Sequence, residues 1–122
     1  MGERILVDTD IFIDYYKSRL DLPLGNIYFI SVISLYEYIR GTKNPQLAKK
    51  LLEESFTIIP LTNSILVKAS EIWRDLRKKA MIIDDRDLII GTTAIVFDLK
   101  LLTKNIKHFS RLKDYGLEFY YL

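Results

Sequence analysis

The sequence contains no cysteine and only one histidine, His108. Without cysteine there can be no disulfide, no catalytic thiolate and no thiolate-bound zinc. The same absence is compatible with a reducing cytoplasm, which is where we expect the protein to act. A lone histidine is more often a surface or helix-end residue than a catalyst, so we assign no role to His108. Metal binding or catalysis in this chain would therefore depend on oxygen ligands.

Long apolar runs are also missing. No stretch approaches the ~20 residues that span a bilayer, and the N-terminus lacks the basic-then-apolar pattern of a signal peptide. Charge is nearly balanced, since 18 Lys and Arg stand against 16 Asp and Glu for a formal net charge of +2. This small excess permits binding to a polyanion but does not argue for it. The chain has no P-loop and no glycine-rich dinucleotide turn.

With 122 residues, of which 49% are hydrophobic, the chain is long enough for a single domain, 1–122, with its own core. Short apolar runs alternate with segments of helical periodicity. We expect strands at 4–8, 27–30, 56–61, 100–103 and 117–121. Helices are expected at 10–18, from Ser31 or Ser34 to Gly41, from Pro45, from 62–64 to about Ala80, and from 84–87 onward. This alternation predicts an α/β domain with a mainly parallel sheet.

Two of these helices have distinct apolar patterns. The helix that begins at 62–64 is amphipathic, and its apolar side chains recur at the helical period. They are Ile65, Ala69, Ile72, Trp73, Leu76 and Ala80. The helix that begins at 84–87 is apolar nearly all round, which predicts a central position in the fold.

Three acidic residues occupy similar places in these elements. Asp8 ends the first strand, Glu37 lies in the second helix, and Asp87 opens the apolar helix. Parallel strands and right-handed connections would bring these positions to one edge of the sheet, where open α/β folds bind ligands. At ~4 Å and an effective dielectric constant near 20, each pair of carboxylates would repel by ~4 kcal/mol. A divalent cation would remove that repulsion, activate a water and stabilise charge on a phosphodiester.

Each acid also has a purely structural interpretation. Asp8 could cap the first helix. Ser34 and Glu37 have the spacing of a capping box, as do Asp84 and Asp87. For any single residue we give the two interpretations equal weight. Caps act on one helix at a time, however, and do not explain why all three acids should meet at one edge.

Basic and tyrosine side chains near these elements suggest a surface for nucleic acid. The basic residues are Arg40, Lys43, Arg86, Lys104 and Lys107. We expect most of them on a solvated surface, with Arg40 and Lys104 as the candidate RNA contacts. Tyr15, Tyr16, Tyr36 and Tyr38 could stack on unpaired bases, although core packing or a dimer surface is the commoner use of tyrosine.

Four stretches, in order and over essentially the whole chain, resemble the PIN-domain nucleases and, most closely, the VapC-type toxins of toxin–antitoxin pairs. They are 6–14 (LVDTDIFID), 33–41 (ISLYEYIRG), 87–94 (DLIIGTTA) and 101–109 (LLTKNIKHF). The resemblance implies a three-layer α/β/α sandwich around about five short strands. It also implies Mg²⁺- or Mn²⁺-dependent cleavage of RNA, a homodimer and a VapB-like antitoxin as partner.

The resemblance assigns roles by position. Asp8, Glu37 and Asp87 correspond to catalytic, metal-binding acids, and Asn105 to a fourth metal-binding position. Thr9, Asp10 and Thr103 would support them. Three positions depart from the usual pattern, because Asp10 replaces an Asn or Ser, His108 an acid and Gly91 an Ala. We expect Gly91 to affect packing alone, and Asn105 to favour a site with one metal ion.

Two other functions remain open. A PIN-like module could bind RNA or protein without cutting, and Asp8 could be the nucleophile of a phosphatase. Absence of Mn²⁺ binding at millimolar concentration would favour the first, and a covalent adduct on Asp8 the second. The complete set of three acids favours the nuclease, because a silent module has little reason to keep buried like charges together.

Overall fold

Five short strands form one sheet in the computed structural model, which describes residues 2–122. They are β1 (Arg4–Val7), β2 (Ile27–Ser31), β3 (Thr57–Ile59), β4 (Lys100–Leu102) and β5 (Glu118–Phe119). Their order in the sheet is β3-β2-β1-β4-β5, and every neighbouring pair is parallel. The expected parallel sheet is therefore confirmed. β3 is shorter than predicted because Pro60, which follows it, has no N–H to donate to a neighbouring strand.

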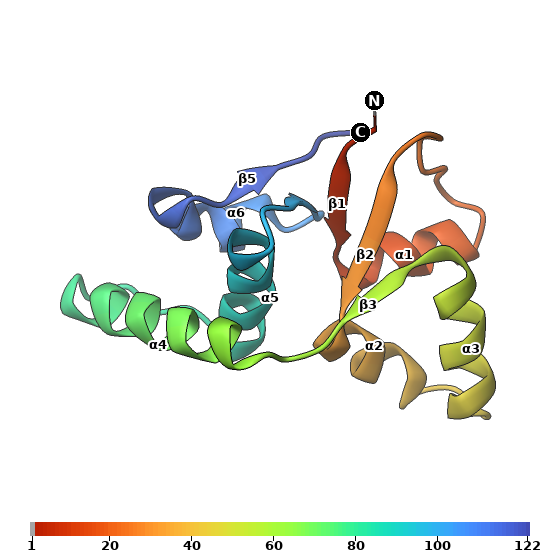
Figure 1. Cartoon of the computed structure of the whole chain (residues 1–122), viewed down its shortest axis with the longest axis horizontal. Helices are drawn as coiled ribbons and strands as arrows, with labels where there is room; N and C mark the ends of the chain where they lie inside the picture. The colour runs from red at the N-terminus through yellow and green to blue at the C-terminus, as the bar shows by residue number, and fades with distance from the viewer. Residues whose placement is uncertain (1) are drawn as a thin grey trace.

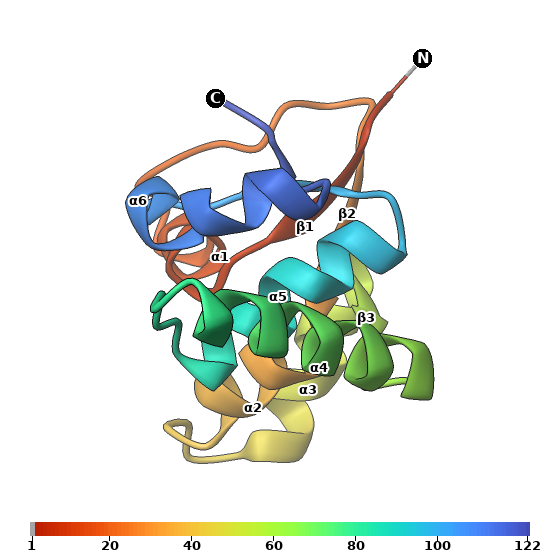
Figure 2. The same cartoon turned by 90° about the vertical axis from the view of Figure 1, so that its left-hand side faces the viewer.

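Helices cover both faces of this sheet (Figures 1 and 2). The elements α1 (Thr9–Tyr16), α2 (Val32–Ile39) and α3 (Pro45–Ser55) lie on one side. On the other side lie α4 (Asn63–Lys78), α5 (Asp85–Val96), α6 (Ile106–Phe109) and the 3₁₀ helix η1 (Ser110–Tyr115). The three-layer α/β/α sandwich implied by the resemblance is the observed architecture.

Each face of the sheet has its own hydrophobic core, because successive side chains of a strand point to opposite faces. On β1, Ile5 and Val7 join the core formed with α1, α2 and α3, whereas Leu6 joins the core formed with α4 and α5. On β4, Leu101 and Leu102 divide in the same way. The continuous apolar runs in these strands are thus explained by burial on both faces.

The two helices with distinct apolar patterns are found, with corrections to α4. Ile65, Ala69, Ile72 and Leu76 are buried as predicted. Trp73, however, is 41% exposed, and Ala80 lies beyond the helix in the left-handed region with φ 55°. α5 is central, as expected, and α4 lies against its outer side (Figure 2).

The helix caps decide between interpretations that the sequence left open. The Ser31 hydroxyl caps α2 by accepting a 3.1 Å hydrogen bond from the Ile33 N–H. Ser34 therefore lies inside the helix, fully buried, and the capping box with Glu37 is wrong. Asp84 precedes α5 as its N-cap residue but makes no capping hydrogen bond with its side chain. Asp8 does cap α1, since its Oδ1 accepts from the Thr9 N–H at 2.8 Å.

The order of the strands sets the position of the site. From β1 the chain adds β2 and β3 to one side, then returns to add β4 and β5 to the other. Val7 and Leu102 are in register at the carboxyl ends of β1 and β4. Asp8 and Thr103 therefore emerge side by side at the point where the winding direction reverses, which is where such sheets place ligands.

Candidate active site

Asp8 is held rigidly at this point. Asp8 is 1% exposed, and its backbone N–H donates to the carbonyl of Leu102 at 2.9 Å. Oδ1 accepts from the Thr9 N–H, and Oδ2 accepts from the Thr103 hydroxyl, both at 2.8 Å. A buried charge is costly unless it is paired and hydrogen-bonded, and these donors offset that cost. Because Asp8 caps α1 and also lies at the reversal point of the sheet, its structural and functional interpretations are compatible.

One guanidinium joins the three acids. Arg86 donates from Nη2 to Asp8 Oδ1 at 2.8 Å, from Nε to Glu37 Oε2 at 2.7 Å, and from Nη1 to Asp87 Oδ1 at 2.8 Å. The predicted gathering of Asp8, Glu37 and Asp87 is therefore present, with a cation in its centre. Thr9 completes the group, because its hydroxyl donates to Glu37 Oε1 at 2.9 Å and accepts from Arg86 Nη2 at 3.1 Å.

Arg86 is the functional-site residue that the sequence reasoning missed. We expected it on a solvated surface, but only 31% of its side chain is exposed. Burial alone would lower the pKa of Arg86, yet the hydrogen bond to Glu37 and the charge of Asp8 outweigh it and raise the pKa above its ordinary value. A signal was available, since a cation in the first turn of a helix opposes the helix dipole and needs acidic partners.

Four further residues of the stretches that resemble the family differ in how they relate to this cluster. Thr103 joins it through Asp8, and Asn105 extends it by donating its backbone N–H to the Thr103 hydroxyl at 3.0 Å. Asp10 is exposed on the first turn of α1. His108 lies at the margin, with Nδ1 3.9 Å from Asp87 Oδ2.

The candidate RNA contacts lie on the surface. Lys104 forms an ion pair with Asp14, and its hydrogen bond lowers the pKa of that carboxyl below the ordinary value. Arg40, at the end of α2, places its guanidinium 5.2 Å from the ring centre of exposed Tyr36. Tyr15 and Tyr38 instead pack with Phe56 and Phe12, which is the core use of tyrosine considered for them. Tyr16 also contacts Phe56 but is 39% exposed.

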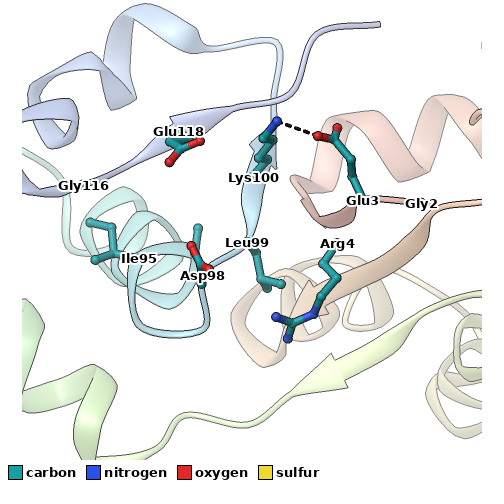
Figure 3. Close-up of a pocket in the computed structure, with 10 residues that line it drawn as sticks. Gly2, Glu3, Arg4, Ile95, Asp98, Leu99, Lys100, Gly116 and Glu118 are labelled. Carbon is teal, nitrogen blue, oxygen red and sulfur yellow. Dashed lines mark hydrogen bonds and ion pairs between the residues drawn. The ribbon is translucent and has the colours of Figure 1, made fainter.

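Two cavities lie at opposite ends of the strands, and they differ in whether they adjoin the acids. One, of about 180 Å³, adjoins the cluster and is lined by Ile82, Ile83, Asp84, Asp87, His108 and Arg111. The other, of about 390 Å³, lies at the amino ends of the strands (Figure 3). There Lys100 is already paired with Glu3, with 2.6 Å between Nζ and Oε1. Of these two cavities, only the first is lined by one of the three acids, Asp87.

The acids suit a hard divalent cation in their chemistry. Their ligand atoms are carboxylate oxygens, which Mg²⁺ and Mn²⁺ prefer, and they already enclose one positive group. Within residues 2–122, however, no three His, Asp or Glu side chains are arranged to hold a single metal ion. Arg86 occupies the space between the three acids. A metal there would be held by Asp8, Glu37 and Asp87 after Arg86 had moved.

Comparison with known proteins places the chain in a family. The PIN domain model matches residues 5–115. Ribonuclease VapC1 of Methanocaldococcus jannaschii is 44% identical over 96% of this chain and 87% of its own length. A VapC ribonuclease of Pyrococcus furiosus is 30% identical over 84% of this chain and 72% of its own length.

A solved structure agrees with this result. The VapBC2 complex of Rickettsia felis, bound to a DNA fragment from its promoter, contains a chain with a TM-score of 0.78 and 25% identity. The match covers 96% of this chain and 97% of that one. In the part of the chain that the structure describes, no helix is long and apolar enough to cross a membrane. The protein belongs to the PIN-domain family and, within it, to the group that contains the VapC proteins.

Proposed function

We propose that this protein is a metal-dependent endoribonuclease and the toxin of a VapBC-type toxin–antitoxin pair. The observation that carries the proposal is the convergence of Asp8, Glu37 and Asp87 on one point. This point lies where the winding direction of the sheet reverses. Membership of a group whose relatives are named VapC ribonucleases supports the same activity.

The acids have different surroundings and therefore different roles. Asp8 is the anchor, because protein donors hold both of its oxygens. The Thr9 hydroxyl orients Glu37, which comes from a different helix. Asp87 is the acid that borders the open cavity, so it is best placed to orient an attacking water.

Mg²⁺ or Mn²⁺, when bound, would supply Lewis acidity to the phosphodiester and lower the pKa of water. Asp8, Glu37 and Asp87 would hold it, with Asn105 as a less direct contributor. The chain's own residues keep these acids close together and exclude solvent from the most buried of them, Asp8.

RNA would approach through the cavity beside Asp87. His108 and Arg111 line this cavity, and Arg40 and Lys104 lie exposed on neighbouring elements. The arginine and lysine side chains at these places would contact phosphates without reading sequence. Such contacts are consistent with an enzyme whose choice of RNA depends on loops and surface charge.

A VapB-like antitoxin is the expected partner, because the matched solved structure is a VapBC complex. A homodimer and a cytoplasmic location are further expectations from the family. Co-expression of this chain with the gene next to its own, followed by size-exclusion chromatography, would test both the partner and the dimer.

The proposed activity can be tested by incubating the purified protein with mixed cellular RNA and Mn²⁺, Mg²⁺ or EDTA. Wild-type protein should cut only with metal, and Asp8→Asn should lose most of the cleavage rate, since it removes the negative charge of a metal ligand. Asp21→Asn, at an exposed loop position, is the matched control and should cut normally. Circular dichroism and thermal unfolding test whether Asp8→Asn remains folded.

Cutting by Asp8→Asn at the wild-type rate, or cutting in EDTA, would contradict the proposal. Metal binding without cutting would point to a narrow RNA target or a retained inhibitor. An absence of both would favour the silent binding module.

A further inference from the structure

We propose that Arg86 is a built-in competitor of the divalent cation. In the metal-free protein its guanidinium is hydrogen-bonded to all three acids, and it must leave them before a metal can bind. The inference rests on the proposed metal dependence and adds to it a residue of this chain that sets the affinity for the metal.

The hydrogen bonds show which carboxylate oxygens are involved. Arg86 takes Asp8 Oδ1, Glu37 Oε2 and Asp87 Oδ1, one from each acid. The other oxygen of Asp8 is held by Thr103, and that of Glu37 by Thr9. The oxygens that face the common centre are thus the ones that Arg86 uses.

A metal ion and the guanidinium cannot share this centre. Both are cations and would repel one another at close range. Both also need the same inward-facing oxygens, which are the ones that Arg86 uses. Binding of one must therefore weaken binding of the other.

Arg86 is able to move. Its side chain is long, it is 31% exposed, and it lies on the first turn of α5, where its positive charge opposes the helix dipole. Asp8 is fixed from two sides by protein donors, so the cluster does not depend on Arg86 alone for its shape. Withdrawal of the guanidinium into solvent leaves the anchor in place.

The size of the effect on metal affinity depends on the fraction of molecules in which Arg86 is inserted, that is, hydrogen-bonded to the three acids. The apparent affinity for the metal is the intrinsic affinity multiplied by the fraction of molecules in which Arg86 is withdrawn. An arginine inserted in about nine-tenths of the molecules would lower the metal affinity about tenfold. Removal of its charge should raise the affinity by that factor.

The test measures Mn²⁺ binding by calorimetry, without RNA. Arg86→Gln should bind Mn²⁺ at least about tenfold more tightly than wild type. Arg86→Lys keeps the positive charge but lacks the planar set of donors of a guanidinium, so its Mn²⁺ affinity should lie between those two. Arg74→Ala removes the same charge from an exposed position on α4 and should leave Mn²⁺ affinity unchanged. In EDTA, Arg86→Gln should unfold at a lower temperature than wild type, and millimolar Mn²⁺ should remove the difference.

A second measurement uses the wild-type protein and does not depend on how well a variant folds. The Arg86 Nε–H, which is bonded to Glu37, should be protected from solvent exchange in EDTA by NMR. Saturation with Mg²⁺ should abolish that protection.

Equal Mn²⁺ affinity in wild type and Arg86→Gln, or protection that persists at saturating Mg²⁺, would overturn the competitor role and leave the nuclease proposal intact. Weaker binding by Arg86→Gln would do the same. An absence of metal binding in every variant would overturn both proposals.

Discussion

The Thr103 hydroxyl donates a 2.8 Å hydrogen bond to Asp8 Oδ2, across 95 positions of the chain. Both residues are buried, and each follows the carboxyl end of a strand in the middle of the sheet. The same hydroxyl accepts from the Asn105 backbone N–H at 3.0 Å. Thr103 thus connects 101–109, the last of the four stretches that carry the family resemblance, to the most buried acid of the site.

Thr103→Val should impair both stability and cleavage, since valine has the same shape but cannot hydrogen-bond. Asp8 Oδ2 and the Asn105 N–H would lose their partner, at a cost of about 1–3 kcal/mol in the free energy of unfolding. Loss of a residue that orients a metal ligand should slow RNA cleavage about 10- to 100-fold. Urea unfolding and a cleavage assay measure the two effects. Thr103→Ser keeps the hydroxyl and should behave nearly as wild type, so equal losses in both variants would contradict this role.

Gly91→Ala should destabilise the protein through a specific steric contact. A Cβ at this position would lie 2.2 Å from Leu112 Cδ1, and Leu112 is fully buried. Alanine in a helix gains about 1 kcal/mol over glycine, whereas overpacking costs about 1–3 kcal/mol. We therefore expect a net loss of about 1 kcal/mol in the free energy of unfolding.

A double-mutant cycle with Leu112→Val tests this explanation of Gly91, because valine lacks the δ carbons. In that background Gly91→Ala should be neutral or stabilising, which gives a coupling energy of about 1 kcal/mol. An unchanged cost would assign the effect to some other contact. The departure from the family pattern at Gly91 would then have no packing explanation.

Arg40→Ala should weaken RNA binding uniformly across sequences. Measured in the Asp8→Asn background, where RNA should not be cut, the slope of log affinity against log salt should fall by about 0.7 for a single-stranded RNA. Lys104→Ala should have a smaller effect, because Lys104 must first leave Asp14. Lys68→Ala, at an exposed position on α4, is the control, and a slope change as large as that of Arg40→Ala would show that the contact is not localised.

Acid sensitivity should depend in part on Asp75. Hydrogen bonds from Tyr115 and Lys79 lower the pKa of Asp75 below its ordinary value. A carboxyl whose pKa is lower in the folded state adds stability above its unfolded pKa, near 4, and loses it as the pH falls through the folded value. Tyr115→Phe removes the larger cause, so its stability should fall less steeply than that of wild type below about pH 4. Urea unfolding between acidic and neutral pH measures the slope, and parallel curves would exclude the contribution.

Local patterns in the sequence were enough for much of the fold. Apolar runs and helical periodicity located all five strands and the main helices, because strand and helix periods are properties of neighbouring residues. The order and context of Asp8, Glu37 and Asp87 placed them at one edge of a parallel sheet. Errors arose where burial depends on distant elements, as for Trp73, which lies exposed on α4, and Ser34, which is buried inside α2.

The sequence by itself determined the class of the domain, the family and the three acids that converge. Only the tertiary structure decided what lies between those acids and what holds them. Arg86 reaches Asp8 across 78 positions and Glu37 across 49, and Thr103 reaches Asp8 across 95. These contacts follow from the order in which the strands join the sheet, which no local pattern of residues specifies.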